Sequence, residues 1–322
     1  MRYRDLAALG KKASVISMGS TYFGSEMPQE QVFDVLDAFY EVGGNFIDTA
    51  RAYGKGASER VIGRWIRARG NREQIVLDTK GGYVTQNGKA VTQLDRDDVL
   101  RHLNESLEAL GVEYVDLYWL HRDDTSRPVG ELVETANALL EGGRVRMIGA
   151  SNWSPERLRQ ARDYALSHGL RPFDADQPQW SLAQMITRED DTLYEMDRAL
   201  YAWHRESGMI CQAYSSQAKG FFIKMDALGE EGLSDKSKRR YLCEGNVRTL
   251  NRLRQLSEET GLSVGALGLA YLTSQPFDTF PIVGVSRVEQ VAALAEAGDA
   301  CLSDAQRDEL HDLRAQVVVG PS

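Results

Sequence analysis

Cysteines, histidines and long apolar runs are scarce in this sequence, and each scarcity excludes a class of protein. The three cysteines, Cys211, Cys243 and Cys301, are an odd number at wide spacing, which fits neither a disulfide framework nor a cysteine metal site. The five histidines are scattered and lack H-x-H spacing, so a barrel metal hydrolase has little support and we expect no metal. No apolar stretch approaches the roughly 18 residues that a membrane span needs.

Clustered positive charge is also missing. Lys and Arg number 38 against 47 Asp and Glu, which gives a net charge of −9, and no basic run resembles a phosphate-binding stripe. The first residues lack the apolar segment of a secretory signal, and the sparse cysteines fit a reducing compartment. We therefore expect a soluble cytoplasmic protein with no nucleic acid and no membrane among its partners.

Short apolar runs do alternate with amphipathic stretches along all 322 residues. Helix ends are marked by Gly70, Gly111 and Gly169, and Ser154-Pro155 is typical of a helix start. The runs have the length and β-branched or aromatic content of strands. They are Ser14–Ser20, Asn45–Ala50, Ile75–Lys80, Val115–His121, Val145–Ser151, Phe173–Trp180, Met209–Tyr214 and Thr279–Val285.

Eight strand–helix units predict an α/β fold, either an open doubly wound sheet or a (β/α)8 TIM barrel. The first run leads into Met18–Tyr22 without the G-x-G-x-x-G turn of a dinucleotide-binding sheet, which favours the barrel. No linker divides the chain, so residues 1–322 are expected to form one barrel domain. Residues 219–246 are polar and strandless and are expected to be a long surface loop with a short helix.

Polar residues follow three successive strands of this predicted barrel. Asp48, Lys80 and His121 each end a strand, and Tyr53 lies in the loop after Asp48. Because catalytic groups of such barrels come from the C-terminal ends of strands, we expect the four to converge. Each residue alone has an ordinary structural explanation, such as a cap, a loop aromatic or a core histidine.

Together these side chains predict a proton-donating site. A buried Lys80 needs Asp48 as its counter-ion, and its ammonium should lower the pKa of Tyr53 from about 10. Tyr53 could then protonate a developing alkoxide while His121 polarises the carbonyl group. The hydride of such a reduction must come from a cofactor, since no side chain supplies one.

At these residues the sequence resembles the aldo-keto reductase superfamily, over essentially its whole length. Asp48, Tyr53, Lys80 and His121 match the catalytic tetrad of that family. The resemblance implies a barrel with an N-terminal β-hairpin near residues 2–17, extra C-terminal helices, and a nicotinamide cofactor, usually NADPH. It also implies cofactor roles for residues at later strand ends, namely Ser151, Asn152 and Gln177 at the carboxamide, Tyr214 stacked on the ring, Ser215, Gln217 and Gly220 over the pyrophosphate, and Ser286, Arg287 and Gln290 at the adenosine phosphate.

The sequence departs from the family pattern in two places. Gln290 stands where the family often has Arg, and Ala293 and Leu294 stand where side chains often hold the adenine, so NADH remains open beside NADPH. Asp78 shares the inward face of its strand with Lys80, at a position where the family more often has a small residue. It is expected either to add a counter-ion for Lys80 or to pair deeper in the barrel.

The expected function is NAD(P)H-dependent reduction of an aldehyde or ketone to an alcohol, with Tyr53 as the proton donor. Tyr22 and Trp119 are candidates for the substrate pocket. Its other walls should come from variable segments, namely Arg122–Gly130, 219–246 and the tail after Arg314, so the carbonyl substrate cannot be read from the sequence. The alternative, by resemblance to potassium-channel beta subunits, is a cofactor-binding regulatory subunit with slow turnover. The oligomeric state is left open.

Overall fold

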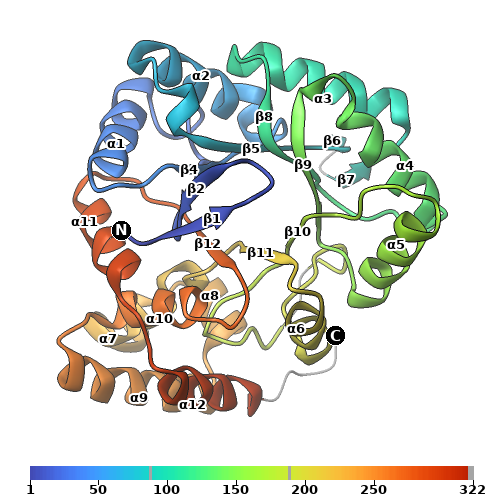
Figure 1. Cartoon of the computed structure of the whole chain (residues 1–322). Coiled ribbons are helices and arrows are strands. Elements are labelled where there is room, and N and C mark those ends of the chain that lie inside the picture. Colours follow the sequence, from blue (N-terminus) through green and yellow to red (C-terminus); the bar gives the residue numbers. More distant parts are fainter. Residues whose placement is uncertain (87–88, 188–189, 318–322) are drawn as a thin grey trace.

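A computed structural model, which describes residues 1–86, 89–187 and 190–317, shows a closed barrel of parallel strands (Figure 1). All eight apolar runs supply a barrel strand, as predicted. Six of the strands are shorter than their runs because the last residues of these runs turn into loops, whereas β5 and β9 are as long as theirs. In barrel order they are β3 (Ser17–Gly19), β4 (Phe46–Asp48), β5 (Val76–Gly81), β8 (Val115–Leu120), β9 (Val145–Ser151), β10 (Ala175–Gln177), β11 (Ile210–Ala213) and β12 (Thr279–Val283).

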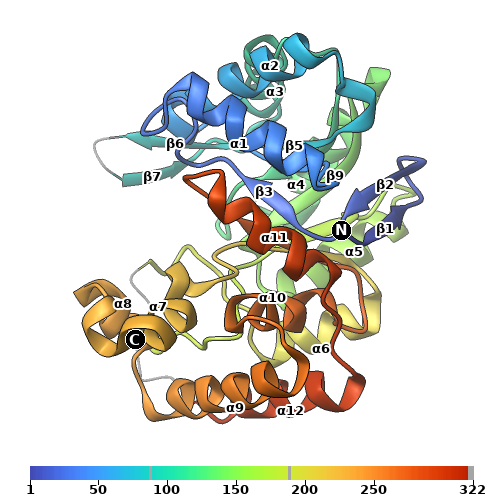
Figure 2. The same cartoon turned by 90° about the vertical axis from the view of Figure 1, so that its left-hand side faces the viewer.

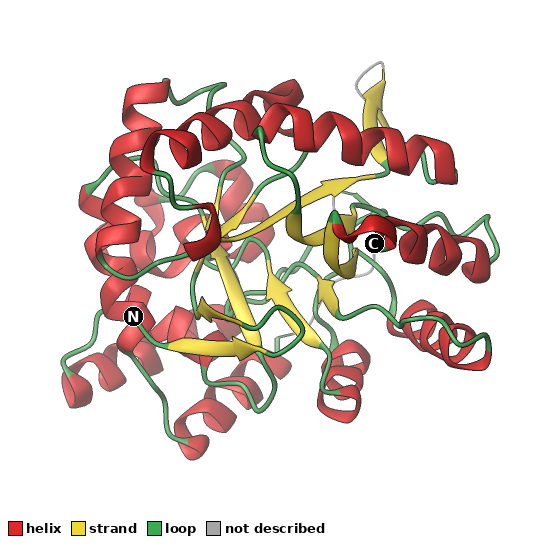
Figure 3. Cartoon of the chain, turned by 45° about the horizontal axis from the view of Figure 1, so that its top comes forward, coloured by secondary structure: helices red, strands yellow, loops and turns green. Residues whose placement is uncertain are grey.

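Helices surround the barrel (Figure 3). One helix or more follows each strand, and α9 and α12, which pack on each other, supply the predicted additional helices. The helices are α1 (Gln29–Glu41), α2 (Ala57–Arg69), α3 (Arg96–Leu110), α4 (Val129–Leu139), α5 (Pro155–Ser167), α6 (Arg198–Ser207), α7 (Phe221–Leu228), α8 (Asp235–Tyr241), α9 (Glu244–Thr260), α10 (Val264–Thr273), α11 (Glu289–Asp299) and α12 (Asp304–Ala315).

The predicted N-terminal hairpin is present and closes one end of the barrel. Its strands, β1 (Tyr3–Leu6) and β2 (Lys11–Ser14), cross the centre of the ring in Figure 1. Leu6, Leu9 and Ala13 are buried against side chains that point into the barrel. Burying this apolar surface excludes water from the lower half of the barrel, which leaves the opposite end for a site.

A second hairpin, β6 (Tyr83–Gln86) and β7 (Lys89–Thr92), extends from that opposite end (Figure 2). It was not predicted, although alternating β-forming residues on both sides of an Asn-Gly pair are a strong hairpin signal. The Asn-Gly pair itself, at 87–88, lies outside the described residues.

The prediction of a long loop over residues 219–246 is wrong. This segment holds α7, α8 and the start of α9. The helices are short and α7 is apolar on more than one side, burying Phe221, Phe222 and Met225, so no periodic stripe marks it in the sequence. The side chains of Ser234 and Cys243 cap α8 and α9 by accepting backbone N–H bonds.

Helices α2 and α3 are in tight contact at Gly63. A Cβ atom at Gly63 would lie 2.1 Å from the backbone oxygen of Leu110, whereas one at Gly268, inside α10, would meet nothing within 4 Å. We expect Gly63→Ala to lower the free energy of unfolding by about 1–3 kcal/mol through overpacking. The matched Gly268→Ala should instead raise it by up to about 1 kcal/mol through helix propensity. Urea unfolding measures both, and equal effects of the two variants would contradict the packing argument.

Candidate active site

A cavity of about 620 Å³ opens at the C-terminal ends of the barrel strands. Three of the four predicted catalytic residues, Asp48, Tyr53 and His121, line it, and Lys80 lies beneath them. The predicted cofactor residues on its wall are Ser151, Asn152, Gln177, Tyr214, Ser215, Gln217, Gly220 and Gln290. The chain therefore brings most of the predicted site residues to one cavity.

Lys80 and Asp48 form a buried ion pair at the floor of this cavity. The Lys80 side chain is only 1% exposed, and its Nζ donates hydrogen bonds to Asp48 Oδ1 and, at 2.8 Å, to the backbone oxygen of Thr49. Burial alone would lower the pKa of Lys80, but the negative charge of Asp48 and the nearby Tyr53 and Asp78 raise it above its usual value. Lys80 is therefore a cation in the protein without ligands.

Tyr53 lies above this cation, with Lys80 Nζ 5.0 Å from the centre of its ring. Burial raises the pKa of Tyr53 above 10, because a phenolate is poorly solvated there, and this outweighs the lowering by Lys80. The prediction that Lys80 brings this pKa below its usual value is therefore wrong in the unliganded protein, although the contribution of Lys80 has the predicted sign. Tyr53 keeps its proton, as a donor must.

His121 completes the group as a neutral imidazole. Its ring centre lies 6.1 Å from that of Tyr53 and 5.1 Å from that of Tyr83, both in edge-to-face contact. Burial and the charges of Lys80 and Arg122 hold the pKa of His121 well below its usual range. A neutral ring has one N–H, so His121 can donate a single hydrogen bond to an oxygen in the cavity.

The predicted carboxamide-binding residues are held rigidly. Asn152 has a positive φ of 64°. Its Oδ1 accepts from the Tyr214 hydroxyl at 2.7 Å and its Nδ2 donates to Ser151 Oγ at 3.0 Å. Ser151 Oγ in turn donates to the backbone oxygen of Gln177 at 2.9 Å. These bonds fix the amide and the tyrosine ring at the cavity wall before any ligand arrives.

The far end of the cavity fits the predicted adenosine-phosphate segment less well. Ser286 and Arg287 are exposed and do not belong to the described lining of the cavity. The side-chain oxygen of Gln290 accepts hydrogen bonds from the backbone N–H groups of both, at 2.8 and 3.0 Å. A phosphate at this turn would have to replace Gln290 as the acceptor.

The two predicted substrate residues have different positions. Tyr22 is 48% exposed and lines the cavity. Trp119 is fully buried in the apolar cluster inside the barrel, and its ring lies where a Cβ atom at Gly149 would come within 2.3 Å. Trp119 therefore packs the barrel interior and is not part of the described cavity wall, contrary to the prediction.

Two of the three segments expected to supply the other cavity walls do so. Arg122, from Arg122–Gly130, and Lys219 and Lys224, from 219–246, line the cavity, whereas the tail after Arg314 supplies no residue of the described lining. Arg122 is held by Thr192, whose backbone oxygen accepts from its Nη1 at 2.9 Å. Tyr83, which packs on His121, was not predicted and belongs to the β6–β7 hairpin.

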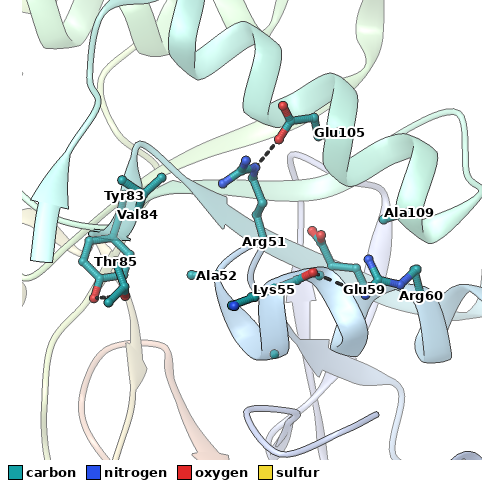
Figure 4. A pocket seen from close by; sticks show the side chains of 12 residues that line it. Arg51, Ala52, Lys55, Glu59, Arg60, Tyr83, Val84, Thr85, Glu105 and Ala109 are labelled. Atoms are coloured by element: carbon teal, nitrogen blue, oxygen red, sulfur yellow. Dashed lines mark hydrogen bonds and ion pairs between the residues drawn. The ribbon is translucent and has the colours of Figure 1, made fainter. Parts of the chain in front are cut away.

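A second cavity, of about 560 Å³, lies between α2, α3 and β6 (Figure 4). Two of its cations, Arg51 and Arg60, are engaged by protein groups. Arg51 is paired with Glu105, and Arg60 Nη2 donates to the backbone oxygen of Lys55 at 3.3 Å. Glu59 is buried and accepts from Thr79 Oγ1 at 2.7 Å. We assign this cavity no function.

The described residues lack two features, a helix that could span a membrane and a cluster of metal-binding side chains. Within residues 1–86, 89–187 and 190–317, no helix is both long and apolar enough to cross a membrane. Over the same ranges, no three or more His, Cys, Asp or Glu side chains are grouped so that they could hold a metal ion.

The fold is that of a TIM barrel with a large cavity at the C-terminal ends of its strands, and comparison with known proteins gives the family. The model of the Aldo/keto reductase family matches residues 15–315, so the chain belongs to this family. A norsolorinic acid reductase B of Dothistroma septosporum is 29% identical over 96% of this chain and 81% of its own length. An aryl-alcohol dehydrogenase [NADP(+)] of Phanerodontia chrysosporium is 30% identical over 97% of this chain and 85% of its own.

The neutral state of His121 makes a prediction about stability and pH. The pKa of His121 is lowered in the folded protein, so below about pH 6.5 the unfolded chain binds a proton at His121 and the folded protein does not. The free energy of unfolding therefore falls as the pH drops below that value. We expect His121→Asn to reduce this loss by up to about 1.4 kcal/mol per pH unit, measured by urea unfolding from pH 7 to 5. Burial also lowers the pKa of His102, to about 4, so His102 should preserve part of the pH dependence of stability in the variant. An identical pH dependence in both proteins would show that His121 is protonated in the fold.

Proposed function

We propose that this protein reduces an aldehyde or ketone to an alcohol with a nicotinamide cofactor, NADPH by preference, and that Tyr53 donates the proton. The observation that carries the proposal is the stack of a neutral phenol over a buried Lys80–Asp48 ion pair, beside a neutral imidazole, at the floor of a large cavity.

The residues present fit such a cofactor. Tyr214, Asn152 and Gln177 offer a ring and amide groups in one part of the cavity, and Lys219 and Lys224 offer positive charge further along. Gly284 leaves open space where a side chain would stand, since a Cβ there would meet only one described atom, at 4.0 Å. When bound, the reduced nicotinamide supplies the hydride.

The side chains of the site supply the rest of the reaction. His121 donates a hydrogen bond to the carbonyl oxygen and so orients and polarises it. Tyr53 then gives its proton to the same oxygen as negative charge develops there. The Lys80 ammonium, fixed by Asp48, stabilises the resulting phenolate. Because the cation is already in place, no charged group has to move during the step.

We infer that the substrates include planar aromatic carbonyl compounds. Tyr22 and Phe23 line the cavity and Tyr83 packs on His121, so aromatic rings surround the place where the carbonyl would lie. The names of the relatives, aryl-alcohol dehydrogenase and norsolorinic acid reductase, point in the same direction.

Removing the Tyr53 hydroxyl tests the proton donor. Tyr53→Phe should retain NADPH binding, followed by fluorescence titration, and lose about 10²- to 10⁴-fold in kcat for an aryl aldehyde. Tyr40→Phe, on the outer face of α1, is the matched control and should leave kcat unchanged. Undiminished turnover by Tyr53→Phe would contradict the assignment. Very slow turnover by the unmodified protein with every carbonyl tried would favour the regulatory-subunit alternative.

The cofactor preference has a test of its own. If Arg287 binds the 2′-phosphate that distinguishes NADPH from NADH, Arg287→Ala should weaken NADPH binding by about tenfold and leave NADH binding nearly unchanged. Lys224→Ala should weaken both cofactors alike if Lys224 contacts the shared pyrophosphate. If Arg287→Ala weakens the binding of NADPH and NADH equally, Arg287 does not bind the 2′-phosphate.

A further inference from the structure

Asp78 is a buried carboxyl that the proposed mechanism leaves without a role. In the ladder between β4 and β5 it is paired with Asp48, so both side chains point into the barrel side by side. Asp78 is 0% exposed and Asp48 is 2% exposed. Two acidic groups are thus buried together beneath Tyr53.

Two glutamines hold this pair in a hydrogen-bond network. Gln212 Nε2 donates to Asp78 Oδ2 at 2.7 Å and to Ser17 Oγ at 3.2 Å. Gln177 Nε2 donates to Asp48 Oδ1 at 2.9 Å and to Gln212 Oε1 at 2.5 Å. Both protons of each amide are therefore used, and the network links the two carboxyls through the glutamines.

One oxygen of Asp78 lacks a donor. Asp78 Oδ1 is buried and receives no hydrogen bond from any described residue, and Asp78 lies opposite Asp48 in the β4–β5 ladder. Two carboxylates only accept, so they cannot bond to each other unless one carries a proton. Burial and the adjacent Asp48 raise the pKa of Asp78 well above its usual range, despite the opposing effects of Lys80 and Gln212.

The charges around Asp78 agree with one proton on the pair. The charged or titratable groups that face it are Asp48 from β4 and Lys80 from β5, with Tyr53 beyond Lys80. The groups from β10, β11 and β3 are the neutral side chains of Gln177, Gln212 and Ser17. With Asp78 protonated, the charges of Lys80 and Asp48 cancel and the cluster is neutral.

We propose that Asp78 is a carboxylic acid that donates a hydrogen bond to Asp48 and serves as a proton store for Tyr53. The proposal rests on the proposed reduction. The Tyr53 O–H bond breaks as its proton passes to the substrate oxygen, and the phenolate takes a proton from Lys80 Nζ. Asp78 Oδ1 passes its proton to the Asp48 carboxylate, and Asp48 passes a proton on to the neutral Lys80 amine.

At the end of this relay Tyr53 is again a phenol, Lys80 is an ammonium, and both aspartates are carboxylates. The cluster has changed from neutral to a charge of −1. The oxidised cofactor carries one positive charge more than the reduced form, and this charge stabilises the negative cluster. The store then refills from solvent when the oxidised cofactor leaves. Asp78 touches neither substrate nor cofactor and acts through Asp48 and Lys80 as a positioning residue.

Infrared spectroscopy of the protein without ligands tests the protonation of Asp78 without reference to activity. With ¹³C-labelled aspartate, the unmodified protein should show an isotope-shifted carbonyl band of a protonated carboxyl at neutral pH. Asp78→Asn should lack this band. Asp176→Asn is the matched control, because Asp176 is equally buried but is paired with His204, and it should keep the band. Absence of the band from the unmodified protein overturns the proposal even if Asp78→Asn fails to fold.

Calorimetry tests the release of the stored proton. Titration with NADP⁺ in two buffers of different ionisation enthalpy should show release of about one proton per site from the unmodified protein and none from Asp78→Asn. NADPH should release none from either. If both proteins release the same number of protons on NADP⁺ binding, Asp78 is not a proton store.

The two proposals fail separately. A carboxyl band and proton release in a protein that reduces no carbonyl would refute the reductase function and leave the acid pair in place. Normal reduction without the band would refute the proton store and leave the reductase function in place.

Discussion

The ion pair between Lys80 and Asp48 is the interaction on which the rest of the site depends. A buried ammonium is tolerated only beside a counter-ion, and here Asp48, the Thr49 carbonyl and the network through Gln177 supply the partners. The barrel makes this pairing possible because neighbouring strands bring residues 32 positions apart in the sequence into contact. Tyr53 and His121 then take their protonation states from this buried charge and from exclusion of water.

The two ends of the barrel have different roles, one in packing and the other in the proposed chemistry. The β1–β2 hairpin and the apolar cluster around Phe46, Trp119 and Phe280 fill the lower half. Polar side chains occupy the upper half, from Asp78 upwards to the cavity. Electrostatic interactions are stronger where water is excluded, and the buried Trp119 helps to exclude water from the barrel below the cavity. Trp119 therefore supports the site although it does not line it.

Hydrophobic pattern and strand-end position were sufficient to predict the eight strands and the meeting of Tyr53, Lys80 and His121. They could not give the partners of Asp78, because Gln212 is 134 residues away and its contact depends on barrel closure. Trp119 was misplaced because alternation tells which face a residue occupies but not its depth in the barrel. The pKa of Tyr53 was misjudged because its burial outweighs the Lys80 charge, and burial is a property of the whole fold. The short helices α7 and α8 lack the periodicity that the prediction relied on.

In the proposed reaction Lys80 acts through Tyr53, so that the two residues work as one unit. A double-mutant cycle on kcat with Lys80→Met, Tyr53→Phe and the combined variant measures this coupling most directly. We expect the double variant to lose no more turnover than the worse of the two single variants. If the two losses instead multiply, Lys80 and Tyr53 act independently, and the proposed role of Lys80 is wrong.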